Sequence, residues 1–205
     1  MTTNNQQNYL SSNEAVDSNH PSIISKAKEL SLGVDGDEAI AQKCFEFVRD
    51  EIDHSGDIVA EITTYKASEV LEHKTGWCYA KSHLLAALLR ANNIPTGLCY
   101  QRLSQGDGGA PYCLHGLNAI YLEAYGWYRV DPRGNKKGVN AQFNPPLETL
   151  AFTIQDDNEG DFEQIYVAPL PEVAEALQCN ANYKEMAQNF PDRVLYKNTY
   201  TKERL

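Results

Sequence analysis

The sequence lacks any long apolar run. Within its 205 residues the best apolar stretch is 84–89, far short of the roughly 18–20 residues that a membrane-spanning helix needs. Residues 1–19 also lack the basic and apolar segments of a secretory signal. We therefore expect no signal peptide, no membrane partner and a cytoplasmic location.

Positive charge is scarce as well. The chain has 18 Lys and Arg against 28 Asp and Glu, a net charge of −10, and no basic stripe. Such a chain repels a phosphate backbone, so nucleic-acid binding is not expected. The five cysteines are an odd number, and neither Cys-x-x-Cys nor His-x-x-x-His occurs. This pattern predicts reduced thiols, no metal site and no cofactor.

What the chain does contain is typical of one globular domain. Hydrophobic residues make up 42% and charged residues 22%. Residues 1–20, rich in Asn, Gln and Ser, predict a flexible polar arm, and residues 21–205 a single domain. The predicted helices are 21–30, 37–53, 78–92, 171–177 and 182–188, and the predicted strands are 96–102, 114–122, 127–130 and the edge strand 165–168. Residues 54–64 read as a loop. Helices followed by antiparallel strands indicate an α+β fold.

Three residues carry the chemistry of the first candidate segment, Gly76, Trp77 and Cys78. A cysteine in the first turn of a helix lies at the positive end of the helix dipole, where free N–H groups favour a thiolate and can bind an oxyanion. The absence of a side chain at Gly76 would allow close approach by a substrate. The alternative is that Cys78 is a small buried hydrophobic residue.

Two further residues fit a nucleophilic cysteine. His115 lies on a predicted strand, where an imidazole could accept the thiol proton and return it to a leaving group. Asp131 ends the next strand and could orient that imidazole. If the two strands form a hairpin, His115 and Asp131 are diagonal neighbours across it, and a β-bulge would place them directly opposite each other. A core histidine and a turn aspartate before Pro132 are the ordinary alternatives.

These segments together resemble the transglutaminase-like superfamily. The segment Thr75–Lys81 with the following helix resembles its nucleophile motif, and 115–121 and 127–132 resemble its histidine and aspartate motifs. The resemblance covers about residues 35–135. It implies a papain-like core, a nucleophile helix packed on an antiparallel sheet with N- and C-terminal helices around it. It also implies that Cys78 is the nucleophile, His115 the acid and base, and Asp131 the orienting carboxylate.

Some residues differ from the pattern of the family, and others have two alternative roles. Gly116 and Leu117 stand where many members have an aromatic residue. No acidic loop has calcium-ligand spacing, and the acidic cluster within 156–161 is expected to be a solvated loop. Trp77 could donate to an oxyanion or anchor the helix, and Cys113 could line the site or simply pack. The basic stretch 133–137 could bind a substrate carboxylate or form a solvated turn.

The sequence thus predicts a cysteine-dependent enzyme that attacks an amide or related acyl bond through a thioester. Its substrate would be a peptide, a protein or a small amide. Water as acceptor makes it an amidase or peptidase, and an amine makes it a transglutaminase; the missing calcium loops and accessory domains favour hydrolysis. A non-catalytic binding module that keeps the fold, or a structural protein with Cys78 in its core, is the alternative. The oligomeric state is left open.

Overall fold

The computed structural model describes residues 6–106 and 108–195. Their helices are η1 (Gln7–Leu10), α2 (Pro21–Ser31), α3 (Asp37–Glu51), α4 (Ser55–Ile58), α5 (Ala67–His73), α6 (Cys78–Ala91), α7 (Pro171–Cys179) and α8 (Tyr183–Met186). The strands are β1 (Asp53–His54), β2 (Thr75–Gly76), β3 (Thr96–Ser104), β4 (Tyr112–Leu122), β5 (Gly126–Val130) and β6 (Gly160–Asp161). The strands form an antiparallel sheet in the order β5-β4-β3-β6 and a short parallel pair, β1-β2.

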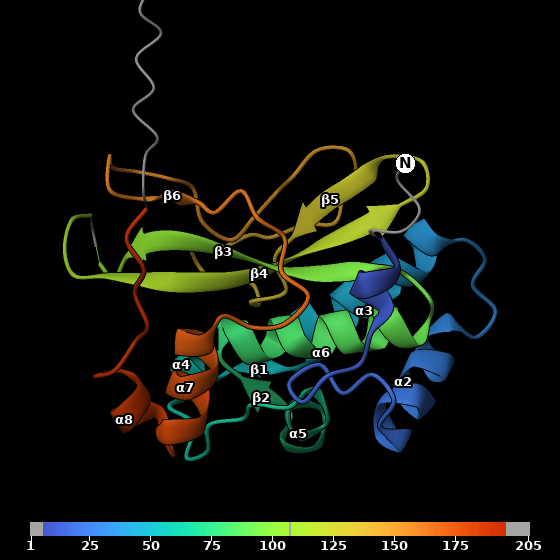
Figure 1. Cartoon of the computed structure of the whole chain (residues 1–205), viewed down its shortest axis with the longest axis horizontal. Helices are drawn as coiled ribbons and strands as arrows, with labels where there is room; N and C mark the ends of the chain where they lie inside the picture. The colour runs from blue at the N-terminus through green and yellow to red at the C-terminus, as the bar shows by residue number, and fades with distance from the viewer. Residues whose placement is uncertain (1–5, 107, 196–205) are drawn as a thin grey trace, which may run out of the picture.

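Helix α6 is the centre of the core. It lies directly below the sheet, and α2, α3 and α5 pack against it (Figure 1). Every residue from Cys78 to Arg90 is buried, as expected for a helix that is covered all round. Its two buried cations bind backbone carbonyls: Lys81 those of Arg49 and Ile52, and Arg90 those of Ser11, Thr96 and Val167. The predicted α+β fold, with this helix packed on an antiparallel sheet, is confirmed.

Residues 6–20, predicted as part of a loosely held arm, pack against the domain instead. Ala15 and Val16 are buried, and the carbonyl of Ala15 accepts a hydrogen bond from the Ala67 amide at 2.9 Å. Tyr9 packs edge-on against Trp127, with ring centroids 4.8 Å apart. The segment is polar on average, so its few apolar residues were not recognised as buried. The sequence also does not show which backbone groups the segment would bind. Residues 1–5 of the predicted arm lie outside the described residues.

Two other local predictions need correction. Residues 54–64 are not all loop, because His54 ends β1 and α4 follows it; the short helix α5 was also not predicted. The edge strand expected at 165–168 is reduced to a single bridge between Leu98 and Tyr166, and β6 pairs with β3 instead. These elements are two to seven residues long, too short to show a periodic pattern in the sequence.

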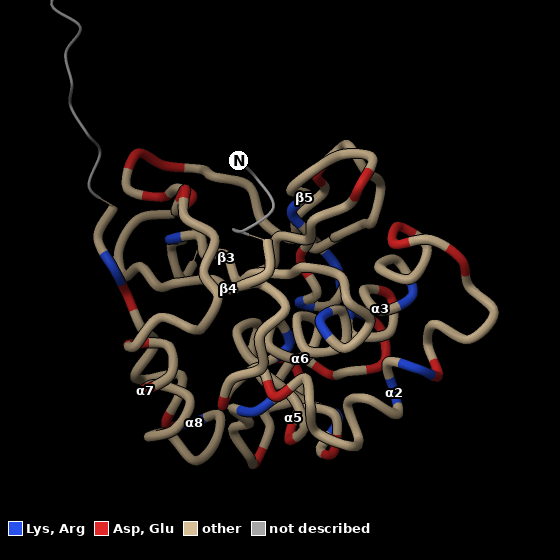
Figure 2. Tube along the Cα trace, turned by 45° about the vertical axis from the view of Figure 1, so that its right-hand side comes forward, with Lys and Arg blue, Asp and Glu red and all other residues tan. Residues whose placement is uncertain are grey.

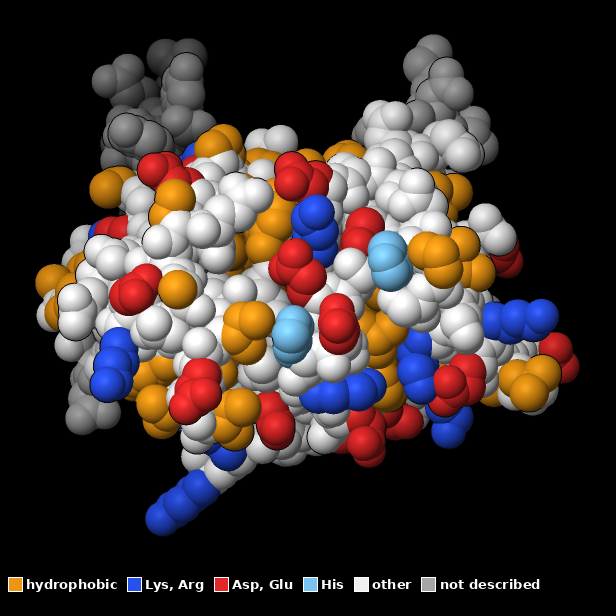
Figure 3. All heavy atoms as spheres, turned by 90° about the horizontal axis from the view of Figure 1, so that it is seen from below, with side chains coloured by type: hydrophobic (Ala, Val, Ile, Leu, Met, Phe, Trp, Pro, Cys, Tyr) orange, Lys and Arg blue, Asp and Glu red, His pale blue; other side chains and the backbone are white. Residues whose placement is uncertain are grey.

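The surface is mixed in charge. Lys and Arg are dispersed among Asp and Glu along the trace rather than gathered in one stretch (Figure 2). On the face seen from below, hydrophobic side chains form small patches between polar and charged ones (Figure 3). Among the described residues, no helix combines the length and apolar character required to cross a bilayer.

Candidate active site

Cys78 is the first residue of α6, and only Trp77 separates it from β2. Trp77 is the N-cap, so the first N–H groups of the helix lie next to the thiol. The pocket beside Cys78 has a volume of about 350 Å³ and is also lined by Trp77, Cys113 and His115. Two of the predicted site residues, Cys78 and His115, therefore meet in one cavity although they are far apart in the sequence.

Gly76 has a structural reason to be glycine rather than the expected catalytic one. It is buried and is not among the residues that line the pocket. A Cβ there would lie 3.2 Å from Ala80 Cβ and 3.3 Å from Thr64 Oγ1. The missing side chain therefore allows β2 to pack closely on α6, and close approach by a substrate is not its role.

The sheet brings His115 and Asp131 together diagonally. Asn118 pairs with Val130 across β4 and β5, which places Asp131 opposite Leu117, two residues from His115. The predicted diagonal arrangement is the one observed, without a bulge. Nε2 of His115 lies 2.7 Å from Oδ2 of Asp131, and both side chains are buried. The ring and the carboxylate thus form a direct, desolvated hydrogen bond.

Backbone amides hold the Asp131 carboxylate in place. Oδ1 accepts from the Arg133 amide at 3.1 Å, and Oδ2 accepts from the Ala151 amide at 3.1 Å. Burial alone would raise the pKa of Asp131, but His115 and these two amides outweigh it and hold that pKa below its usual value. Asp131 is therefore an anion with a fixed orientation.

His115 is the charge partner of both neighbours. Burial opposes a charge on the ring, but the Asp131 carboxylate and the Cys78 sulfur outweigh it and raise the pKa of His115 to about 10. Because Nε2 faces Asp131, Nδ1 is the nitrogen left for the thiol. The Gly116 amide also points at the sulfur, with N and Sγ 3.5 Å apart. The arrangement can hold an imidazolium beside a thiolate.

Gly116 also accounts for the departure noted in the sequence. A Cβ at this position would lie 3.0 Å from Tyr79 Cα, so the glycine lets the first turn of α6 approach β4. An aromatic wall is present nonetheless. The ring of Phe152 packs edge-on against His115, with centroids 5.0 Å apart, and lines the pocket.

Comparison with known families identifies the superfamily of the chain. The family model of the transglutaminase-like superfamily matches residues 24–132, which include Cys78, His115 and Asp131. The chain belongs to the transglutaminase-like superfamily. No curated protein matches it.

Solved structures share the transglutaminase-like fold. A candidate cysteine protease from Cytophaga hutchinsonii is similar with a TM-score of 0.50 and 16% identity, over 61% of this chain and 40% of that one. The periplasmic domain of TgpA from Pseudomonas aeruginosa is similar with a TM-score of 0.49 and 19% identity, over 64% of this chain and 48% of that one. The chain thus spans less than half of the length of these two relatives.

Much of the pocket wall of this transglutaminase-like chain lies outside the matched region. Phe152, Gln155, Glu159 and Phe190 all line the pocket and follow residue 132. The predicted motif core of residues 35–135 therefore omitted them. They reach the pocket through long-range contacts that no local sequence signal reports.

Trp77 is held by three aromatic neighbours. Its ring lies 5.4 Å from that of His54, 5.9 Å from Tyr183 and 5.1 Å from Phe190, centroid to centroid. The indole N–H is buried and has no hydrogen-bond partner among the described residues. Of the two roles left open for Trp77, this packing favours the anchor at the start of α6.

Cys113 lines the pocket on the same strand as His115. Burial, with a smaller contribution from Cys78, raises the pKa of the Cys113 thiol to about 12. Cys113 is therefore a neutral wall residue near neutral pH, whereas the thiol of Cys78 faces the imidazole.

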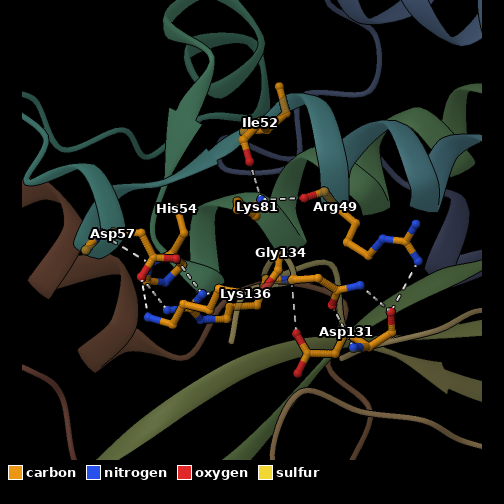
Figure 4. A network of polar contacts seen from close by, with 12 residues as sticks. Arg49, Ile52, His54, Asp57, Lys81, Asp131, Gly134 and Lys136 are labelled. Atoms are coloured by element: carbon orange, nitrogen blue, oxygen red, sulfur yellow. Dashed lines mark hydrogen bonds and ion pairs between the residues drawn. The ribbon is translucent and has the colours of Figure 1, made fainter. Parts of the chain in front are cut away.

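The charged segments near the site are tied down rather than solvated. Arg133 forms two hydrogen bonds of 2.6 and 2.8 Å with Asp57, and Lys136 forms one of 2.6 Å with the same carboxylate (Figure 4). Glu159 accepts from the Ser104 amide at 2.8 Å and the Gln155 amide at 2.6 Å. The expectations of a solvated turn and a solvated acidic loop are wrong at Arg133 and Glu159, which are buried, whereas Lys136 stays exposed.

His54 is a pocket residue that the sequence analysis missed. It ends β1 and pairs with Gly76 of β2, so it lies beside the nucleophile segment. A two-residue parallel strand has no signature in the sequence. The only local sign was that His54 follows directly on a predicted helix.

Proposed function

We propose that this protein is a cysteine-dependent amide or acyl-bond enzyme that acts through a thioester. The observation that carries the proposal is the alignment of Cys78, His115 and Asp131. A thiol at a helix N-terminus faces an imidazole whose other nitrogen lies 2.7 Å from a buried carboxylate. The superfamily and the fold agree with a cysteine enzyme.

The reaction begins with the Cys78 thiolate. Its sulfur attacks the acyl carbon, the S–C bond forms, and the carbonyl electron pair moves to the oxygen. Collapse of this intermediate breaks the bond to the leaving amine, which takes a proton from His115. The acyl group remains on Cys78 as a thioester.

The second half of the reaction uses the same groups. An acceptor, either water or a primary amine, gives its proton to His115 as it attacks the thioester, and the Cys78 thiolate leaves. Asp131 touches no reacting atom. It fixes the ring orientation and stabilises the imidazolium, because its carboxylate is bound to Nε2 and to two backbone amides.

The substrate is a peptide, a protein or a small amide, and water is the acceptor in our proposal. The pocket of about 350 Å³ is at the lower end of the range for small-molecule pockets and has room for an acyl side chain. Its walls combine aromatic rings, Phe152 and Phe190 among them, with the polar side chains of Gln155 and Glu159. These walls favour an acyl group with an apolar body.

The test is the mass of an adduct on Cys78. The protein is incubated with glutamine-containing peptides and simple amides, with and without a primary amine, and is acid-quenched for intact-mass and peptide analysis. An acyl adduct on Cys78, absent in Cys78→Ala, supports the proposal, and release of free acid or of an amine conjugate identifies the acceptor. No adduct with any donor, together with an inaccessible Cys78, would favour the binding module.

A further inference from the structure

The oxygen of the tetrahedral intermediate needs a donor besides the helix N-terminus. The first N–H groups of α6 point toward the N-terminal side of Cys78, so the oxygen lies on that side. His115 approaches from β4 on the other side, where the leaving group must be protonated. The second donor is therefore expected among residues next to β2.

His54 occupies that place. The parallel pairing of β1 with β2 sets His54 opposite Gly76, two residues before Cys78, and its side chain lines the same pocket. Trp77 is less suited, because its indole N–H is buried. Arg133 also lines the pocket, but its guanidinium is bound to Asp57.

Hydrogen bonding fixes the tautomer of His54. Nδ1 accepts from the Gly56 amide at 3.2 Å, so this nitrogen carries no proton and the hydrogen is on Nε2. The Nδ1–Cε1 edge of the ring packs toward Gly56, since a Cβ there would meet both atoms at 3.2 Å. The Nε2–H bond diverges across the ring from the Nδ1 lone pair, so it points away from the Gly56 amide of α4 while the side chain lines the pocket.

The surroundings keep the ring neutral and rigid. Burial first, and then the charge of Arg133, lowers the pKa of His54 well below its usual value; Lys81 and His115 add to this, and Asp57 opposes it. Lys81 of α6 binds the Ile52 carbonyl just before β1 (Figure 4). The ring also packs edge-on against Trp77. A fixed N–H donor of this kind needs no reorganisation during the reaction.

We propose that Nε2–H of His54 donates a hydrogen bond to the oxyanion formed when Cys78 attacks the acyl carbon. This inference rests on the proposed function, because it needs an acyl substrate on Cys78. His54 is then the third side chain that contacts a reacting atom, besides Cys78 and His115, and it acts without gaining or losing a proton.

Two isosteric variants separate this role from a structural one. His54→Gln keeps a donor near Nε2 but loses the acceptor for Gly56, whereas His54→Asn keeps an acceptor near Nδ1 and loses the pocket donor. Each variant is acylated with p-nitrophenyl acetate, which forms an oxyanion, and alkylated with iodoacetamide, which forms none. His73→Gln, an exposed histidine at the end of α5, is the matched control.

The proposal predicts that His54→Asn slows acylation about 10²–10³-fold, the usual effect of removing one oxyanion donor. Alkylation stays near the wild-type rate, and His54→Gln retains most of the acylation rate. Acylation of His54→Asn at the wild-type rate would overturn the proposal. So would a parallel loss of acylation and alkylation, which indicates that His54 only positions the nucleophile segment.

A measurement on the wild-type protein covers the case in which a variant does not fold. A peptide aldehyde adds to Cys78 to form a hemithioacetal: the S–C bond forms, the carbonyl π bond breaks, and the oxygen takes up the thiol proton and lies where the oxyanion would. The NMR resonance of His54 Nε2–H should move downfield on addition, and an unmoved resonance in the formed adduct contradicts the proposal. If the wild-type thiol reacts with neither ester nor aldehyde, the proposed function itself fails.

Discussion

Residues 24–132 and residues 133–195 contribute different things to the site. The first region holds the groups that we propose to react on long, continuous elements: Cys78 on α6, and His115 on β4. The second holds pocket walls on short elements and irregular segments, attached by individual contacts such as the Leu114 amide to the Pro191 carbonyl at 2.7 Å. The difference suggests that chemistry and substrate selection can be separated by mutation.

The largest effect is expected in the first region. Cys78→Ala should abolish acyl-enzyme formation, and His115→Ala should be nearly as severe, because the thiol loses its base and the amine its proton donor. Asp131→Ala should be milder than either, although loss of an orienting residue can still cost up to roughly 10⁴-fold in rate. The measurement is turnover of a confirmed substrate by variants that circular dichroism and thermal melts show to be folded. Wild-type turnover by Cys78→Ala would refute the cysteine mechanism.

The second prediction concerns the charge on His115. NMR titration of the wild-type ring should show its transition near the pKa of about 10, and Asp131→Asn should move it down by more than one unit. Since the folded pKa is raised, the stabilisation by its partners is fully present below the unfolded value of about 6.5 while Asp131 is ionised. It is lost as the pH rises through about 10. A wild-type transition near 6.5 would show that Asp131 does not stabilise the imidazolium.

The third prediction compares the stability of the two regions. Leu88→Ala on the fully buried face of α6 should lower the free energy of unfolding by about 2–5 kcal/mol. Asp192→Asn weakens the Asp192–Arg102 ion pair, in which the Asp192 side chain is 34% exposed, and should cost less than about 1 kcal/mol. Urea unfolding measures both. A larger loss from Asp192→Asn would mean that the second region supports the whole domain.

The smallest effect is expected on selectivity. Phe190→Ala removes a pocket wall and should reduce kcat/KM for an apolar acyl donor by about 10–100-fold. Alkylation of Cys78 by iodoacetamide should stay near the wild-type rate. Phe143→Ala, which removes an aromatic residue that packs on Phe45 away from the pocket lining, is the matched control. Equal losses in acylation and alkylation would show that the wall also supports the nucleophile.

The difference between residues 24–132 and 133–195 also explains which features could be predicted from the sequence. Helix α6 and strands β3 to β5 have repeating patterns, and Cys78, His115 and Asp131 lie in motifs on them, so the diagonal pairing followed from hairpin geometry. The pocket walls could not be predicted from the sequence, because Phe152 and Phe190 reach the pocket through tertiary contacts. His54 was missed because β1 is only two residues long and is recognisable as a strand only by its pairing with β2.

Buried polar contacts were the other limit. Nothing local indicated that Arg90 would bind the Ser11 carbonyl and hold the N-terminal segment, or that Asp57 would bind Arg133 and Lys136. Each of these contacts joins residues at least 76 positions apart. From composition alone, such segments were therefore expected to be exposed to solvent.

The central claim is that Cys78 is a nucleophile activated by its partners, and competitive alkylation tests it most directly. The protein is treated briefly with iodoacetamide near neutral pH, and each cysteine is mapped by mass. Burial raises the pKa of Cys44, Cys99 and Cys113 to about 12, so Cys179, which is exposed, is the real competitor. We predict that Cys78 reacts first, faster than Cys179 despite being buried, and that His115→Ala reverses this order. Equal rates at Cys78 and Cys179, unchanged by His115→Ala, would contradict the account.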